Sequence, residues 1–239
     1  MTFGHAAAIW DDYPQLVAGV LAVGPISAAV DVRPRVANYE EAARSRLETQ
    51  TESDLAEIKA WRQAFARMRL KPTQYRCAAE SLLRRFRKDG SLPRIHPLID
   101  LCNAVSLAFA IPVAVFDAAK IGDDLEVRHA SGAEIYETFS GQVEHPDEGE
   151  VIFADDAGRA HARRWTNRQS GYSAVRPGTS SALIVAEAMH DRGRESIDDL
   201  IAAVTTELEL AWSVAPASKV LSSRSPRFDF REAAAAERR

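Results

Sequence analysis

Residues 149–171, GEVIFADDAGRAHARRWTNRQSG, decide what kind of domain this chain forms. An acidic strand leads through a turn into a basic, aromatic strand, and this alternation is typical of a hairpin. Guanidinium groups bind phosphate and carboxylate groups with two parallel hydrogen bonds. The stretch therefore predicts a surface that binds an anionic ligand and recognises a small polar group at the end of that ligand. A hairpin alone does not explain why five arginines follow the turn with no acid between them: Arg159, Arg163, Arg164, Arg168 and Arg176.

Length and composition favour one large α+β domain, or one domain with an appended helical arm. The chain has 239 residues, 46% of them hydrophobic and 27% charged, which is enough to bury a full core. Two cysteines, Cys77 and Cys102, are too few for a disulfide framework and indicate reduced thiols of a cytoplasmic protein. Residues 1–10 lack the basic and apolar regions of a signal peptide. Residues 98–116 are long enough to cross a bilayer, but the polar residues and proline inside them predict a buried helix, a break and a buried strand.

Hydrophobic periodicity and turn residues place the expected elements along the chain. Gly90 and Ser196 are expected as caps of the second and the last helix. Periodicity leaves residues 181–189 open between a strand and a buried helix. Residues 1–212 are expected to form a single domain, and residues 213–239, rich in Ser, Arg and Ala, a poorly ordered tail. Helices are expected at residues 38–68 (one or two), 78–88, 98–110 and 196–212, and strands at 16–23, 111–116, 126–130, 134–139, 150–153 and 160–165.

The net charge of −4 is distributed unevenly along the chain. Residues 61–94 contain ten Lys or Arg against two acids, whereas residues 116–156 contain twelve acids against two bases. This separation predicts a bipolar surface with one face suited to phosphates. The alternative is that the basic run is the solvated side of a helix.

The motifs of several enzyme classes are absent from the sequence. The six histidines are scattered, without an i,i+4 pair, and no Cys-x-x-Cys occurs, so a zinc site is not expected. No Walker-A loop, G-x-G-x-x-G or G-x-S-x-G is present, and nothing local supports a Ser/His/Asp triad. We therefore expect no metal and no cofactor.

Two polar sets remain as candidates for chemistry. Asp100, Asn103 and Ser106 share one face of an apolar helix, where they either tie the helix to neighbouring loops or line a pocket, because unsatisfied buried polar groups cost about 1–3 kcal/mol. In the basic strand, Arg163 is equally suited to salt bridges with the acidic half or to a ligand. A ligand is favoured for Arg168 and Gln169. Two further residues also have two interpretations: Asp117 and Thr179 suit turn capping or the same pocket.

A series of segments in this order resembles the B3/B4 domain, the editing module of the bacterial phenylalanyl-tRNA synthetase β subunit, and especially its free-standing relatives. The resemblance covers roughly residues 16–189. The segments that carry it include PRIHPLID (93–100), PVAVFD (112–117), GEVIFAD (149–155) and RRWTNRQS (163–170).

The resemblance implies an α+β fold with a central mixed sheet flanked by helices, and a pocket that hydrolyses an amino acid misattached to the 3′ end of a tRNA. In the synthetase the substrate is tyrosine joined to phenylalanine tRNA. This chain is expected to lack the synthetase's catalytic core, so it is not a ligase by itself and acts in trans. Where the synthetase domain has a pocket histidine, this chain has Ala114. The Gly-Gly loop of the synthetase falls near residues 169–171, and its side-chain-reading glutamate near Val185, with Glu187 close by.

The resulting interpretation is a tRNA-associated protein, with a trans-editing deacylase as the main function and a non-catalytic module that binds an amino acid, a nucleotide or tRNA as the alternative. A protein-interaction domain is a third option, supported only by the helices of residues 38–68 and the tail.

No catalytic residue is assigned, no membrane contact is expected, and Ala114 is expected to leave room for a larger or differently shaped amino acid. The expected pocket is bordered by Asn103, Ser106, Ala114, Glu134, Arg164, Arg168, Gln169 and Thr179. The expected RNA-binding residues are Arg84, Arg85, Arg164, Trp165 and Arg168.

Overall fold

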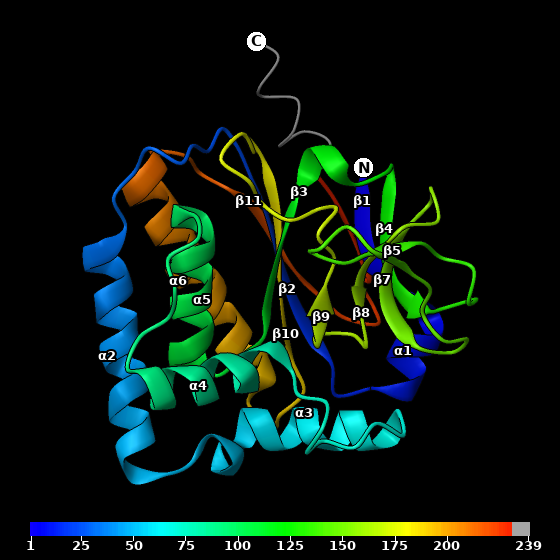
Figure 1. Cartoon of the computed structure of the whole chain (residues 1–239), viewed down its shortest axis with the longest axis horizontal. Helices are drawn as coiled ribbons and strands as arrows, with labels where there is room; N and C mark the ends of the chain where they lie inside the picture. The colour runs from blue at the N-terminus through cyan, green and yellow to red at the C-terminus, as the bar shows by residue number, and fades with distance from the viewer. Residues whose placement is uncertain (231–239) are drawn as a thin grey trace.

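Two sheets lie face to face, and helices cover the outer face of one of them (Figure 1). The computed structural model describes residues 1–230. The first sheet is antiparallel, with the strand order β11 (Ala217–Leu221), β2 (Val17–Val23), β10 (Ala182–Ala188) and β3 (Val113–Asp117). The second sheet has the order β12 (Arg227–Asp229), β1 (Thr2–His5), β4 (Asp124–His129), β7 (Val151–Asp155), β8 (Ala160–Arg163) and β9 (Arg168–Gln169). It is mixed, because β1 and β4 are parallel whereas its other pairs are antiparallel.

Six α-helices, two short 3-10 helices (Glu52–Asp54 and Ala118–Lys120) and a small hairpin complete the described part of the chain. The hairpin pairs β5 (Tyr136–Glu137) with β6 (Val143–Glu144). In Figure 1 most helices stand on one side of the four-stranded sheet, whereas α1 lies beside the six-stranded sheet. The helices are α1 (Ala7–Asp12), α2 (Arg33–Thr49), α3 (Ala56–Arg67), α4 (Ala78–Asp89), α5 (Pro97–Phe109) and α6 (Gly193–Trp212).

Strand β10 shows how period-2 alternation fills both layers of the core. Leu183 and Val185 belong to the cluster between the two sheets, whereas Ile184 and Ala186 pack with residues of α5 and α6 in the cluster on the helical side. Both faces are apolar and buried, which is why sequence periodicity alone did not separate a strand from a buried helix. Glu187 falls on the same face as Val185 and therefore points between the sheets.

The α+β class with a mixed sheet is confirmed, and the second, antiparallel sheet is an addition to the prediction. Residues 98–116 form α5 and β3 with a break between them, where Ala110 takes the left-handed conformation (φ 56°). Gly90 ends α4 in the left-handed conformation, as predicted. Within residues 1–230, no helix is long and apolar enough to cross a membrane.

Three local predictions are wrong. Helix α6 begins at Gly193, so Ser196 lies inside it and its hydroxyl contacts the ring of His190 instead of capping the helix. Residues 164 and 165, expected in a strand, form a turn in which both backbones are left-handed. The segment expected to be a poorly ordered tail contains β11 and β12, because edge strands of the two sheets recruit polar residues through backbone pairing. Residues 231–239 of that segment lie outside the described residues.

Candidate functional site

A small cavity of about 60 Å³ lies between the two sheets, beside the turn that joins β8 to β9. Ala114 of β3 pairs in register with Val185 of β10, and both line the cavity. Gln169 lies on the opposite wall and is tied to β3, because its amide nitrogen donates to the backbone carbonyl of Val115 at 2.7 Å. Three positions that lie far apart in the sequence therefore meet at one cavity.

Glu187 is a buried carboxylate on the wall of this cavity, with an exposed fraction of 1%. Its Oε1 is 2.7 Å from Nε2 of His5 and accepts a hydrogen bond from the indole Nε1 of Trp165 at 2.9 Å. Within residues 1–230, no hydrogen bond reaches its second oxygen, Oε2. A buried carboxylate is costly unless it is paired, so this oxygen is the cavity's strongest available acceptor.

The turn after β8 supplies the remaining polar atoms of the cavity. Thr166 lies on the cavity wall, and its Oγ1 is buried without a hydrogen-bond partner in the described part of the chain. The backbone of the turn is anchored from outside, since Thr166 accepts a hydrogen bond from the Ala78 amide and Asn167 donates to the carbonyl of Arg76. The cavity thus offers a hydroxyl, an amide and a carboxylate at fixed positions between apolar walls.

Two arginines of the basic strand are held by acids of the preceding half. Arg163 is buried and pairs with Glu150 and Glu144, each at 2.8 Å. Arg168, which lines the cavity, pairs with Glu144 at 3.0 Å and stacks over Tyr136. Hydrogen bonds from Arg168 lower the pKa of Glu144, so this pair stays charged at neutral pH. The salt-bridge interpretation therefore describes the contacts of Arg163. Arg168 lines the cavity, but some of its N–H donors are already bonded to Glu144.

The polar face of α5 ties the helix to its connectors. Asp100 accepts a hydrogen bond from the Ile95 amide at 2.8 Å, and Ser106 donates to the Ile111 carbonyl at 2.6 Å. The lining of the small cavity includes neither Ser106 nor Asn103. These contacts match the structural alternative for this face, in which polar groups are satisfied by loop backbone.

Glu134 and Thr179 were expected at the same pocket, but they organise turns elsewhere. Glu134 accepts the backbone amides of Ser131 and Gly132 and pairs with Arg128. Burial raises the pKa of Glu134, but these donors outweigh burial and lower it to about 2. Thr179 donates to the Asp117 carboxylate at 2.7 Å, which leaves Asp117 in a turn-capping role.

The expected RNA-binding residues differ in how accessible they are. Trp165 is fully buried and packs edge-on against Trp61 with ring centres 5.2 Å apart, so its ring offers no exposed stacking face. Arg84 pairs with Glu52 at 2.9 Å, and Arg85 lies 3.6 Å from Asp89. Arg164 lines a separate, larger cleft on the other side of the turn. Of the eight expected pocket residues, the small cavity brings together Ala114, Arg168 and Gln169.

A Ser–His–Asp arrangement, not anticipated from the sequence, lies close to the β7–β8 hairpin. The His161 ring contacts the Ser173 hydroxyl through Nδ1 at 2.8 Å and the Asp155 carboxylate through Nε2 at 3.0 Å. Ser173 and His161 have no exposed surface, and Asp155 also accepts the Arg159 amide. A nucleophile must reach its substrate, so this buried arrangement connects the loop after β9 to the sheet and does not form a hydrolytic site. Sequence reasoning missed it because twelve residues separate its serine and histidine without a motif.

Two further observations limit the chemistry. Within residues 1–230, no group of three or more His, Cys, Asp or Glu side chains is arranged to hold a metal ion. Both cysteines are free and buried, and burial raises the pKa of Cys77 and of Cys102 to about 12, so neither is a thiolate at neutral pH.

The fold and the cavity define an α+β domain of two facing sheets with a largely apolar cavity between them that carries a few polar groups. Comparison with known families then identifies the domain: the B3/4 domain matches residues 60–197, more than half of the chain. The chain belongs to the B3/4 domain family.

Curated relatives are β subunits of phenylalanine–tRNA ligase. The subunit of Nocardia farcinica is 29% identical over 148 residues, which cover 62% of this chain and 15% of that protein. The subunit of Corynebacterium glutamicum is 36% identical over 84 residues, covering 34% and 10% respectively. The chain thus spans a small part of these relatives. An N-terminal fragment of the phenylalanyl-tRNA synthetase β subunit from Pyrococcus horikoshii is similar over 52% of this chain and 41% of the fragment, with 13% identity and a TM-score of 0.41, which is too low to support an argument.

Proposed function

We propose that this protein is a tRNA-associated B3/4-domain protein that hydrolyses misacylated aminoacyl-tRNA in trans. Family membership supports the relation to phenylalanyl-tRNA synthetase β subunits. The single observation that carries the proposal is the meeting of Ala114, Gln169 and Glu187 at one cavity. These positions lie at or beside those that the resemblance assigns to the pocket histidine, the Gly-Gly loop and the reading glutamate.

The proposed chemistry is positioning without a strong base. An aminoacyl ester is already activated, so holding a water molecule against its carbonyl can supply much of the rate enhancement. The Thr166 hydroxyl and the Gln169 amide would orient the water or donate to the developing oxyanion. The free Oε2 of Glu187 would accept the α-ammonium group of the aminoacyl moiety.

The cavity volume favours a small aminoacyl group. The cavity is small, about 60 Å³, and its walls include the large rings of Phe153 and Trp165. This differs from the expectation that Ala114 leaves room for a larger amino acid, because these rings fill the space between the sheets. We therefore expect glycyl, alanyl or seryl esters to be preferred over aromatic ones.

The alternative is a non-catalytic module that binds an amino acid, a nucleotide or tRNA. The observation that favours it is Ala114, which provides no imidazole where the synthetase domain has one. A module of this kind would bind the same small ligands in the cavity and leave the ester intact.

A deacylation assay separates the two functions. The purified chain is incubated with tRNAs charged with small or aromatic amino acids, and ester loss is compared with the spontaneous rate. We expect faster loss of the small esters, at least a tenfold slower reaction for Gln169→Ala, and an unchanged rate for Gln142→Ala, whose amide is on an exposed loop. Loss at the spontaneous rate for every ester rules out the hydrolase and leaves the binding module.

A further inference from the structure

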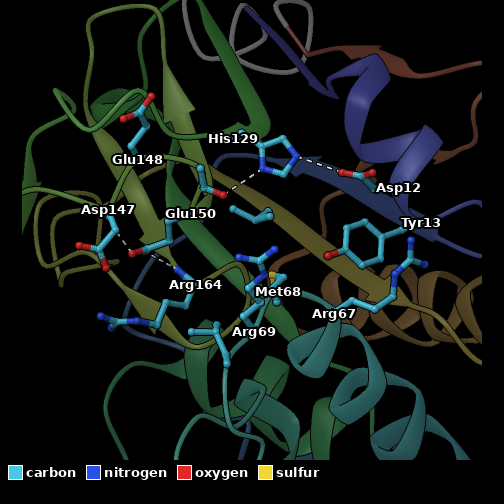
Figure 2. A pocket seen from close by; sticks show the side chains of 13 residues that line it. Asp12, Tyr13, Arg67, Met68, Arg69, His129, Asp147, Glu148, Glu150 and Arg164 are labelled. Atoms are coloured by element: carbon cyan, nitrogen blue, oxygen red, sulfur yellow. Dashed lines mark hydrogen bonds and ion pairs between the residues drawn. The ribbon is translucent and has the colours of Figure 1, made fainter.

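A second, larger cleft of about 460 Å³ opens on the other side of the turn from the small cavity. Its walls come from the end of α1, residues 67–70 after α3, the end of β4 and the loop of residues 147–150. Figure 2 shows the guanidinium groups of Arg67, Arg69 and Arg164 spread along this cleft, with Arg69 between the other two. His129 and Asp12 lie at its upper edge in this view.

The three arginines of this cleft lack ion-pair partners among the described residues, although Arg164 has an electrostatic interaction with the neighbouring Glu150. Within residues 1–230, none of them forms an ion pair. Arg67 stacks over Tyr13 and Arg164 over Tyr75, each with the guanidinium carbon 4.9 Å from the ring centre. Such stacking fixes the plane of a guanidinium and leaves its N–H edges available to an anion.

Other arginines of the basic run 61–94 form ion pairs with acids of the same fold. The acids that pair with them are buried or lie on the same helix, as for Glu80 and Asp89. The paired arginines are Arg62, Arg76, Arg84, Arg85, Arg87 and Arg94. The uncompensated guanidinium charge of this run is therefore concentrated at the cleft, where Arg164 of the distant basic strand joins it.

Some of the acids of the cleft have a close polar partner within the described residues, and others do not. Asp12 lies 3.1 Å from the His129 ring, and Glu150 pairs with Arg163 outside the cleft and accepts the backbone amide of Arg164. Asp147 reaches Arg163 only at 4.0 Å and has a highly exposed side chain, and Glu148 has no ion pair within the described residues. The cleft thus offers three guanidinium groups as donors and, on the loop of residues 147–150, two carboxylates as acceptors.

Backbone conformation holds two of the arginines in place. Arg69 (φ 60°) and Arg164 (φ 48°) are left-handed, which costs a non-glycine residue of order 1 kcal/mol. Amide hydrogen bonds hold both conformations, from Leu70 to the Phe65 carbonyl and from Arg164 to the Glu150 carboxylate. Strain of this kind concentrates at functional sites.

We propose that the cleft of Arg67, Arg69 and Arg164 binds successive phosphates of an RNA strand, while Asp147 and Glu148 accept hydrogen bonds from ribose hydroxyls. Guanidinium groups spread along a cleft match a chain of phosphates better than the single phosphate of a free nucleotide. Paired donors and acceptors match a phosphate carried by a ribose, since a bare anion would be repelled by the two carboxylates. The identification of this RNA as tRNA rests on the proposed function.

The test compares two double variants of equal charge. Arg67→Glu with Arg69→Glu, and Arg192→Glu with Arg194→Glu at two exposed arginines where α6 begins, each change the net charge by −4, so a general electrostatic effect lowers affinity equally in both. Binding of labelled uncharged tRNA is measured by fluorescence anisotropy over a series of salt concentrations. We expect the cleft variant to lose at least tenfold in affinity and its salt slope to fall by roughly 1.4, from two single-strand phosphate contacts. The control variant should change less than threefold.

Three outcomes overturn the proposal: equal losses in the two variants, no binding of any tRNA, or full competition by millimolar AMP, which would assign the cleft to a free nucleotide. Should the glutamate variant unfold, Arg67→Gln with Arg69→Asn replaces it, because asparagine tolerates the left-handed conformation of residue 69, and Arg192→Gln with Arg194→Asn becomes the control with the same change of charge. Uncharged tRNA carries no ester, so the result does not depend on hydrolysis. If the protein hydrolyses the ester but the cleft variant binds tRNA as well as the unaltered protein does, only the proposal for the cleft is refuted. If binding depends on the cleft but no ester is hydrolysed, only the proposed hydrolase activity is refuted.

Discussion

Removing the acceptor at Glu187 should destabilise the fold far more than removing its charge. The carboxylate Oε1 faces Nε2 of His5 and Nε1 of Trp165 at 2.7 and 2.9 Å, and all three side chains are buried. Glu187→Leu leaves both nitrogens without an acceptor. Each unsatisfied buried donor costs about 1–3 kcal/mol, so the expected loss is about 2–6 kcal/mol of a total stability of about 5–15 kcal/mol. Glu187→Gln keeps an oxygen acceptor of the same shape and should cost about 1 kcal/mol.

Urea unfolding followed by tryptophan fluorescence measures both variants, since Trp61 and Trp165 report from the core between the sheets. The comparison is valid where the m-value, the dependence of the unfolding free energy on urea, stays constant. A matched control is Glu207→Leu on α6, which removes a half-buried acceptor that Tyr39 and Arg35 use at the protein edge. Equal losses for Glu187→Leu and Glu187→Gln, or a loss below about 1 kcal/mol for the leucine variant, would refute the role assigned to the two hydrogen bonds.

Three further outcomes are expected. Ser173→Ala should lower the unfolding free energy by about 1 kcal/mol and leave any ester hydrolysis unchanged, because the hydroxyl is buried against His161; lost hydrolysis with retained stability would make this serine catalytic. The folded-state pKa of Glu134 is lowered to about 2, so the charged carboxylate stabilises the fold at pH values above its unfolded pKa near 4.3, and this stability is lost as the pH falls toward 2. In urea titrations, Glu134→Gln should therefore lower the unfolding free energy by about 2–3 kcal/mol at pH 6 and by little at pH 2. Ala114→His should change which aminoacyl ester is hydrolysed or bound, and identical preferences would place the reading site elsewhere.

Local signals predicted the elements whose ends are set by neighbouring residues. Helix α4 ends at Gly90, and the apolar run before β3 breaks at Ala110, because in both cases the chain must enter the left-handed region at a defined position. Strand β1 was missed because its four residues have no alternation of their own and gain strand structure by pairing with β4 and β12. The same reason applies to β11 and β12, which are polar edge strands.

Glu187 was placed near the pocket only by the resemblance and was not among the expected pocket residues, although the sequence carries a signal for it. Glu187 interrupts the apolar run of β10, and an isolated acid in a buried strand signals that partners must exist. Its partners, His5 and Trp165, are separated from it by 182 and 22 residues, so no spacing rule reveals them. The ion pair of Arg84 was hidden for the same reason, since its partner Glu52 lies 32 residues away. Charge runs in a sequence show where guanidinium groups occur, and tertiary structure decides which of them stay unpaired.

The turn after β8 lies between the small cavity and the large cleft. Consecutive left-handed residues direct neighbouring side chains to different places: Arg164 lines the large cleft, whereas Trp165 enters the core and donates to Glu187 at the small cavity. The backbone amide of Arg164 is bound by Glu150, and that of Trp165 by the carbonyl of Val151. Two consecutive residues where β7 begins, Glu150 and Val151, therefore hold both residues at once. A strand of RNA in the cleft would contact one end of this turn, and an aminoacyl group in the cavity the other, so the turn fixes the relative position of the two parts of a single ligand.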